Sequence, residues 1–303
     1  MSKPQVVLSF DIEEHHRIEA AHHLTVPLDA QDRYRQRMEE RTLWLLEQLR
    51  QRGLKATFFV VGELARSCNT LVRAIAWEGH EVASHGWDHR RVLDMTREEF
   101  RRDVRDSKAA LEDATGQPVV GYRAPTFSIV RRTAWAIDIL AEEGYQYDSS
   151  IYPVRHDRYG IPDAPLTPFV IPTASGPIVE VPPLTLRSGW LNLPVGGGGY
   201  FRLLPTWLMH WGIRQMTRRN PEAPAVLYFH PWEFDTEQEQ LPLGFLSRMR
   251  TYRGIHGSVE RLGRLMDNDY HFRRLVDVVT EGFDQQQIPT FALNTSAVAS
   301  HPA

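Results

Sequence analysis

Carboxylates and histidines follow two apolar runs of this sequence, at the places where β-strands are expected to end. Asp11, Glu13 and Glu14 come directly after QVVLSF. His85 and His89 follow EVAS within the string HGWDH. Carboxylates that crowd together at a buried position must be protonated, paired or bound to a cation. Two histidines four residues apart, joined by a carboxylate, are the ligand set of catalytic zinc or non-haem iron. The pattern predicts a divalent metal site, whereas a solvated acidic loop would account for the first string alone.

Two more polar residues stand at predicted strand ends. Arg123 lies in GYRAP, and His230 follows AVLYF in the string FHPWEFD. The carboxyl ends of parallel strands point to one face of an α/β domain, and active sites are built there. We therefore expect residues from four separate strands to share one site. The alternatives are a structural ion pair for Arg123 and a hydrogen-bonding role at the strand end for His230.

The elements that position these residues alternate between strand and helix. Buried strands are predicted at 5–10, 56–61, 81–84, 121–123 and 225–229. Helices are predicted at 32–51, 71–78, 131–143, about 205–219, and from a capping box at Thr96–Glu99 to about Gly116. This alternation predicts an α/β fold with a parallel sheet, either open or closed into a barrel.

The stretch from about Ser150 to Pro205 interrupts this alternation. It holds many prolines and the run GGGGY at Gly196–Tyr200, and it is too long for a simple connection. We expect an irregular insertion or lid at about 150–205, with the glycines marking a close bend of the backbone. A flexible tail is expected at 294–303, which leaves a single domain over 1–293.

Composition limits the possible partners. The chain has 303 residues, of which 42% are apolar, and a formal net charge of −3. This charge predicts neither a basic face for nucleic acid nor a polybasic patch for lipid headgroups, so sugars and small molecules remain. Cys68 is the single cysteine, which excludes an intrachain disulfide. No signal segment is recognised, and no apolar run approaches the roughly 20 residues of a membrane span, so a cytoplasmic protein is expected. The sequence leaves open whether the chain forms a homo-oligomer.

Seven motifs together resemble the polysaccharide deacetylase superfamily, the NodB-homology fold. They are FDIEEHH, TFFVVGELA, EVASHGWDH, GYRAPTFSI, YDSSIYP, GGGYFRLLP and LYFHPWEFD, in the expected order from about residue 5 to about residue 290. Within the superfamily the sequence is most similar to the deacetylase of exopolysaccharide loci associated with PEP-CTERM protein sorting. The resemblance implies a distorted, often incomplete (β/α) barrel. It also implies metal-dependent removal of N-acetyl groups from amino sugars of a polysaccharide or its precursor.

The resemblance further implies a role for each residue that matches a family motif. Asp11 matches the catalytic base, Arg123 the arginine that pairs with it, and His230 the general acid. His85 and His89 match the metal-binding histidines. This set suits amide hydrolysis, which needs a metal-activated water, a base to take its proton and an acid to protonate the departing amine.

One departure from the family motif concerns the third metal ligand. The common motif has two adjacent aspartates, whereas Ile12 takes the second place here. The metal carboxylate is therefore either Glu13 or Glu14, and relatives with an Asp-x-Asp arrangement favour Glu13. The implied cofactor is one divalent ion, Zn²⁺.

Aromatic residues close to the motifs could form a platform for a sugar ring, although large aromatics are more often part of a core. The candidates for substrate binding are Trp87, Tyr122, Pro125, Trp190, Tyr200 and Trp232. The expected substrate is an N-acetylated sugar or glycan. Two other functions remain open: hydrolysis of another amide, such as a cyclic imide or ureide, and carbohydrate binding without catalysis. The complete set of site residues argues against the last of these.

Overall fold

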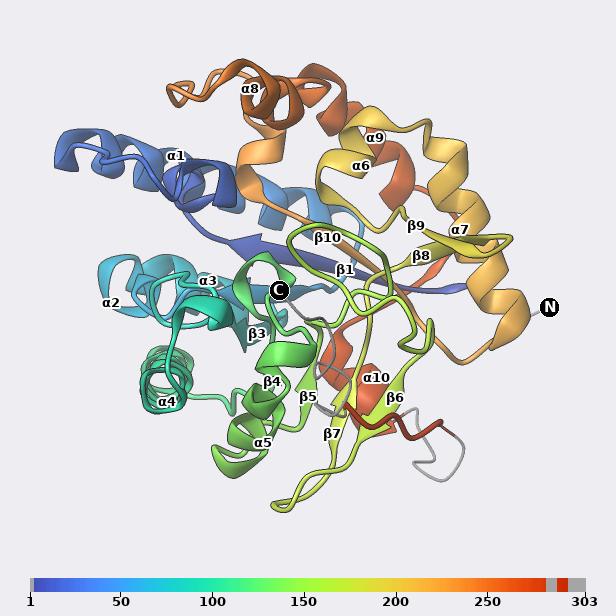
Figure 1. Cartoon of the computed structure of the whole chain (residues 1–303). Coiled ribbons are helices and arrows are strands. Elements are labelled where there is room, and N and C mark those ends of the chain that lie inside the picture. The colour runs from blue at the N-terminus through green and yellow to red at the C-terminus, as the bar shows by residue number, and fades with distance from the viewer. Residues whose placement is uncertain (1–2, 282–287, 294–303) are drawn as a thin grey trace, which may run out of the picture.

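A curled sheet of mostly parallel strands forms the centre of the structure, a computed structural model that describes residues 3–281 and 288–293 (Figure 1). In order across the sheet the strands are β10 (Ala225–Phe229), β1 (Gln5–Ile12), β2 (Thr57–Val60), β3 (Glu81–Ser84), β4 (Gly121–Tyr122), β5 (Tyr147–Asp148), β7 (Ile178–Glu180) and β6 (Phe169–Ile171). β11 (His271–Arg273) also pairs with β1, and only the β6–β7 pair of this sheet is antiparallel within the described residues. The predicted fold class, a distorted and incomplete (β/α) barrel, is confirmed.

Side chains on β1 alternate between the two faces of the sheet. Leu8 and Phe10 belong to the large apolar cluster under the outer helices, whereas Val7 packs with Phe59 in a smaller cluster on the inner face. All eight residues of β1 are buried, as expected for a parallel strand covered on both sides. Because the side-chain period is two, Asp11 points to the same inner face as Val7. Its carboxylate therefore lies inside the curl, near the carboxyl end of the strand.

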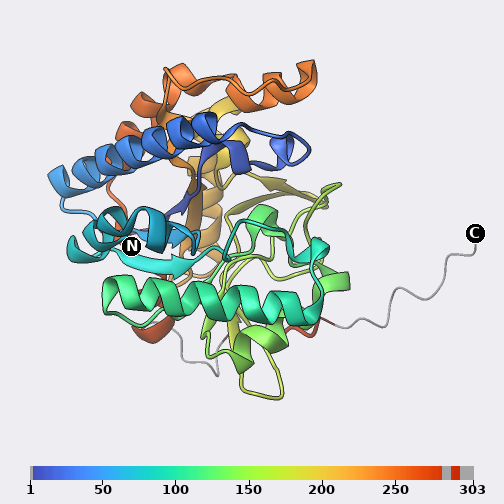
Figure 2. The same ribbon diagram turned by 90° about the vertical axis from the view of Figure 1, so that its left-hand side faces the viewer.

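Helices cover the outer face of the sheet, and Figure 2 shows α1, α3 and α4 stacked across it. The main helices are α1 (Leu28–Gln51), α2 (Leu64–Ser67), α3 (Asn69–Trp77), α4 (Arg97–Thr115), α5 (Trp135–Glu142), α7 (Thr206–Arg219), α9 (Ser258–Met266) and α10 (Leu275–Glu281). The predicted capping box at Thr96 is present, since the Thr96 hydroxyl accepts from the Glu99 amide and the Glu99 carboxylate accepts from the Thr96 amide. No helix within the described residues is long and apolar enough to cross a membrane.

The 150–205 segment contains more regular structure than we expected. It includes β6 and β7, which extend the main sheet, the hairpin of β8 (Thr185–Ser188) and β9 (Leu191–Pro194), and α6 (Gly198–Leu203). Each of these strands has only three or four residues and lies between prolines or glycines, which is too short for a two-residue period to be recognised. The predicted tail at 294–303 lies outside the described residues.

The glycine run, expected to mark a close bend, brings two separate backbone segments into contact. Gly197 pairs with Tyr228 of β10, and a Cβ at Gly197 would lie 1.8 Å from the Tyr228 carbonyl oxygen. The Gly196 carbonyl accepts a hydrogen bond of 2.8 Å from the Tyr228 amide. Pro183 pairs with Val226 on the same strand. The segment after β7 thus follows the outer edge of β10 and brings α6 close to the end of that strand.

Candidate active site

A cavity of about 710 Å³ opens where several parallel strands end. Asp11 and Glu13 enter it from the end of β1, His85 and His89 from the loop after β3, and His230 from the end of β10. Ligand sites of α/β folds are found at this edge because the loops that follow the strands converge there. The structure therefore brings together five of the polar residues that the sequence singled out.

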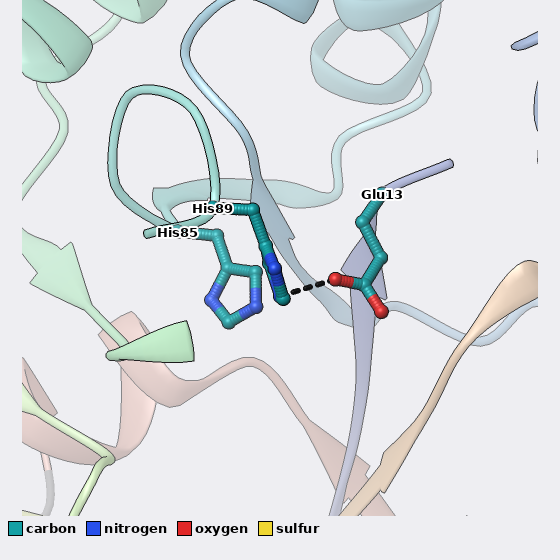
Figure 3. Close-up of side chains that lie close together, drawn as sticks. All are labelled: Glu13, His85 and His89. Carbon is teal, nitrogen blue, oxygen red and sulfur yellow. Dashed lines mark ion pairs between the residues drawn. The ribbon is translucent and has the colours of Figure 1, made fainter. Parts of the chain in front are cut away.

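Glu13, His85 and His89 form a cluster that could hold a metal ion (Figure 3). One ligand atom from each residue lies within 4.8 Å of the other two. The loop reaches this arrangement through two left-handed residues, Gly86 with φ 75° and His89 with φ 66°. Glycine suits the first position, because a Cβ there would be strained and would lie 3.0 Å from Oδ2 of Asp103.

Hydrogen bonding orients the His85 ring toward the cluster. Its Nδ1 donates to the Arg123 carbonyl oxygen at 2.8 Å, which leaves Nε2 unprotonated in the neutral ring. Burial lowers the pKa of His85 to about 4, so the neutral form, which binds metals, dominates at neutral pH. The His89 Nε2 atom lies against the Glu13 carboxylate, a contact that needs a proton or a cation. Two imidazoles and one carboxylate fit a divalent ion with open positions for water and substrate.

Glu14 points away from this cluster. Its Oε2 accepts from Arg17 Nε at 2.6 Å, and Arg17 also binds Glu63 at 2.7 Å. Glu14 has an extended backbone, so its side chain projects to the side opposite that of Glu13. Of the two carboxylates that the sequence left open, Glu13 has the position of a ligand.

Arg123 is fully buried behind Asp11 and holds that carboxylate in place. Its Nη1 donates to Asp11 Oδ1 at 2.7 Å and to Ser9 Oγ at 2.8 Å. Its other nitrogens bind the carbonyl and hydroxyl oxygens of Ser149, and its guanidinium lies 4.0 Å from the centre of the Phe59 ring. These contacts fix the orientation of the guanidinium group. The other oxygen of Asp11, Oδ2, faces the cavity.

His230 faces Asp11 across the site and carries a proton. Its Nε2 lies 3.9 Å from Asp11 Oδ2 and 3.7 Å from Glu13 Oε1, and its Nδ1 donates to Glu233 Oε1 at 2.7 Å. Burial disfavours the charged ring, but the hydrogen bond to Glu233 and the charges of Glu13, Glu233 and Asp11 outweigh burial and raise the pKa of His230 to about 9. The imidazolium is therefore the dominant form at neutral pH.

Sequence reasoning missed the two residues that support His230. Glu233 Oε2 accepts from Arg202 Nε at 2.9 Å, and both side chains are buried. Burial raises the pKa of Glu233, but its bonds to His230 and Arg202 lower it overall. Two signals were available: Glu233 stands three residues after His230, and Arg202 is the one charged residue of the motif GGGYFRLLP.

Two of the aromatic candidates line the cavity. Trp232 lies on its wall with its ring stacked on His230 at 5.4 Å between centroids, and Tyr200 lines it from α6. Pro125 is buried between two lining residues, Ala124 and Thr126, and is not itself part of the wall.

The other three aromatic candidates lie elsewhere. Tyr122 is part of the outer apolar core, because its position on β4 faces the helices. Trp190 is 85% exposed at the turn between β8 and β9. Trp87 lines a separate surface hollow, with the Arg66 guanidinium 4.7 Å from its ring centre. Nearness to a motif in the sequence did not tell which side of the backbone each ring would take.

Comparison with known families divides the chain into two parts. Residues 2–147 match the family model for polysaccharide deacetylases, and residues 149–280 match the model described as Domain of unknown function (DUF3473). The first part contains Asp11 and the three residues of the candidate metal site, whereas the second contains His230 and its support. Strands of both parts lie in one sheet, and both parts line the same cavity.

Curated relatives match over about a third of the chain. A peptidoglycan-N-acetylglucosamine deacetylase from Bacillus cereus is 30% identical over 117 residues, which are 35% of this chain and 42% of that protein. A chitooligosaccharide deacetylase from Rhizobium leguminosarum bv. trifolii is 32% identical over 97 residues, which are 32% of this chain and 42% of that protein. The chain thus spans less than half the length of each of these relatives.

A solved structure matches along nearly the whole chain. The crystal structure of a candidate polysaccharide deacetylase from Mycobacterium smegmatis superposes with a TM-score of 0.60 and 21% identity, covering 95% of this chain and 94% of that one. At this identity the match shows the shared fold. Together with the family model and the curated relatives, these findings show that residues 2–147 are similar to polysaccharide deacetylases.

Proposed function

We propose that this protein is a metal-dependent hydrolase that removes N-acetyl groups from amino sugars of a polysaccharide or its precursor. One observation carries the proposal. A cluster of metal-ligand type, a carboxylate fixed by a buried arginine and a protonated histidine all line one cavity. These are the three parts that amide hydrolysis needs.

Glu13, His85 and His89 are the residues that would hold the ion. Zn²⁺ is the ion we propose, because imidazole and carboxylate ligands with open positions suit it. When bound, it supplies Lewis acidity, which lowers the pKa of a water and polarises the acetamide carbonyl.

Asp11 and His230 carry the two proton transfers. Asp11 Oδ2, left free by the arginine, accepts the proton of the attacking water. His230 Nε2 donates its proton to the sugar nitrogen as the C–N bond breaks, because the amine anion is too poor a leaving group. The two atoms are 3.9 Å apart, so both reach the same reacting carbon and its substituents. Water adds to the carbonyl carbon, and the products are acetate and the free amino sugar.

The cavity has the size and lining of a sugar site. Its volume of about 710 Å³ lies within the roughly 300–1,000 Å³ typical of small-molecule sites. Trp232 and Tyr200 offer apolar ring faces, which suit the apolar faces of pyranose rings. The names of the curated relatives, which refer to peptidoglycan and chitooligosaccharide, support an N-acetylated amino sugar as the substrate class. The motif resemblance extends the proposal to exopolysaccharide.

Acetate release provides the test. The protein is stripped of metal, reloaded with zinc, and supplied with N-acetylglucosamine oligomers, N-acetylated polysaccharides, cyclic imides and ureides. We expect acetate from the N-acetylated sugars, loss of activity after stripping, and recovery with zinc. Trp190→Ala, which changes an exposed ring outside the cavity, is the matched control. Turnover of the cyclic amides alone, or sugar binding without any acetate, would contradict the proposal.

A further inference from the structure

Helix α8 (Phe245–Tyr252) exposes large apolar side chains to solvent. Phe245 is 77% exposed, Leu246 70% and Met249 41%. Figures 1 and 2 both place α8 at the upper edge of the molecule, beyond α1. Single exposed apolar residues are common on soluble proteins, but three on two turns of one helix form a patch of the kind that contacts partners or membranes.

Three arginines lie among these apolar residues. Arg248, Arg250 and Arg253 are all exposed, and the stretch 245–253 contains no carboxylate. None of the three forms an ion pair within residues 3–281 and 288–293. From the net charge of −3 we expected no basic patch for lipid headgroups. That expectation missed these arginines, because a sum over the whole chain does not show where like charges are grouped. We call Phe245, Leu246, Arg248, Met249, Arg250 and Arg253 the α8 surface.

The inner side of α8 belongs to the wall of the cavity. Ser247 and Thr251 line the cavity, and so does Arg250, which is exposed at the edge between the cavity and the α8 surface. The Thr251 carbonyl accepts a hydrogen bond from Arg202, which binds Glu233. The Tyr252 hydroxyl accepts from the Leu241 amide at 2.7 Å. The helix is therefore held on the site by its inner residues, and whatever binds the α8 surface lies beside the mouth of the cavity.

We propose that the α8 surface docks on an anionic lipid surface, with the cavity mouth next to the headgroups. Arginines alone would fit any polyanion, but the exposed Phe245 and Leu246 also require an apolar environment. A membrane interface offers both, since arginines bind anionic headgroups while apolar side chains enter the acyl boundary.

A second copy of the chain fits this surface poorly. A two-fold contact centred on α8 would place the three arginines of a second copy on the same small surface as these three, and like charges brought together repel. The proposal does not depend on the proposed deacetylase activity, because the residues changed in its test, Phe245, Leu246, Arg248 and Arg253, do not line the cavity.

Vesicle co-sedimentation of the full chain tests the proposal. We expect binding to vesicles of phosphatidylcholine with phosphatidylglycerol, little binding to phosphatidylcholine alone, and weakening by salt. Each arginine near such a surface contributes about fivefold, so Arg248→Gln with Arg253→Gln should lower the partition coefficient about 30-fold. Phe245→Ser with Leu246→Ser should lower it at least about 10-fold.

Matched controls separate this effect from a general change of charge or hydrophobicity. Arg218→Gln with Arg219→Gln removes the same charge from exposed positions on α7, and Trp77→Ser removes an exposed ring on α3. Both should bind vesicles as the wild type does, and circular dichroism should show all variants folded. Equal binding to both vesicle types, or equal losses in the controls, would overturn the proposal. The proposal would also be overturned if the wild type does not bind vesicles and instead forms a concentration-dependent dimer, or a complex with another protein, that is lost in Phe245→Ser with Leu246→Ser.

Discussion

The support of His230 by Glu233 leads to a prediction about pH dependence. Glu233→Gln keeps the size of the side chain and a hydrogen-bonding oxygen but removes the negative charge next to Nδ1 of His230. A cation bound at Glu13 would take up the charge of that carboxylate, so Glu233 is the main support of the imidazolium in the loaded enzyme. Arg202 would also lose its partner, and its positive charge would further disfavour a proton on His230.

The size of the effect follows from the protonated fraction of His230. With a pKa of about 9, about nine tenths of the imidazole is protonated at pH 8. With its ordinary pKa of about 6.5, only about 3% is protonated at that pH. Because a general acid works only in its protonated form, the rate should fall by about 10-fold or more at pH 8 and by much less at acid pH, where the imidazole of the variant is also protonated.

The assay is kcat/KM for acetate release on metal-loaded protein, measured from acid to alkaline pH. In the wild type the alkaline fall caused by the loss of this acid should lie at higher pH than in Glu233→Gln, because the Glu233 carboxylate raises the pKa of His230. An activated aryl acetate, whose leaving group needs no proton, should show a much smaller change. Glu237→Gln, an exposed glutamate four residues away, is the control. The reasoning is refuted if both proteins share the same alkaline fall, or if both substrates lose equally.

Three further predictions concern the metal site, the base and a buried carboxyl. Glu13→Gln should lose stoichiometric zinc in elemental analysis, and Glu14→Gln should retain it; the reverse outcome would exchange their roles. Asp11→Asn should keep its zinc but turn over at least about 100-fold more slowly, and loss of zinc would instead place Asp11 among the ligands. Burial raises the pKa of Asp103 to about 7, so the folded state binds a proton at this carboxyl more tightly than the unfolded state does. The stability that this proton contributes is lost as the pH rises from about 4 through about 7. Relative to wild type, Asp103→Asn should therefore gain at most about 3 kcal/mol in free energy of unfolding between pH 5 and pH 8. Thermal unfolding that shows the same difference at both pH values would contradict this.

The matched part of unknown function has a visible place in the site. Residues 149–280 supply His230, its partners Glu233 and Arg202, and a wall of the cavity that includes Trp232. Residues 2–147, which match the polysaccharide deacetylase model, supply the candidate ligands and base. Neither part contains all three components of the proposed mechanism, so the reaction needs both.

The sequence by itself determined the fold class and the polar residues of the site. Strand–helix alternation predicts a parallel sheet, and the carboxyl ends of parallel strands share an edge. Asp11 lies near the carboxyl end of its strand and His85, His89 and His230 follow theirs, so topology alone brings them together. Local signals of this kind need only the near neighbours in the chain, as the capping box at Thr96 also shows.

The tertiary structure decided what depends on contacts between distant residues. Arg17, which binds Glu14 locally, is itself held by Glu63, 46 residues further along. The bond between Arg202 and Glu233 spans 31 residues and depends on the glycine run folding against β10. No periodicity in the sequence encodes such pairs, because each requires two segments to pack in one particular relative position.

The same reason explains the aromatic residues and α8. Whether an aromatic side chain near a motif lies in the cavity, in the core or in solvent depends on how its backbone packs. Trp232 therefore lines the cavity, whereas Trp190 is exposed to solvent. The net charge of the chain does not reveal the local positive charge of α8. The sequence also does not show which side of α8 is exposed, because that depends on the packing of its inner residues against the site. Sequence patterns fix which residue types follow a strand or share a helix, whereas burial and long-range pairing arise from the three-dimensional packing of the whole chain.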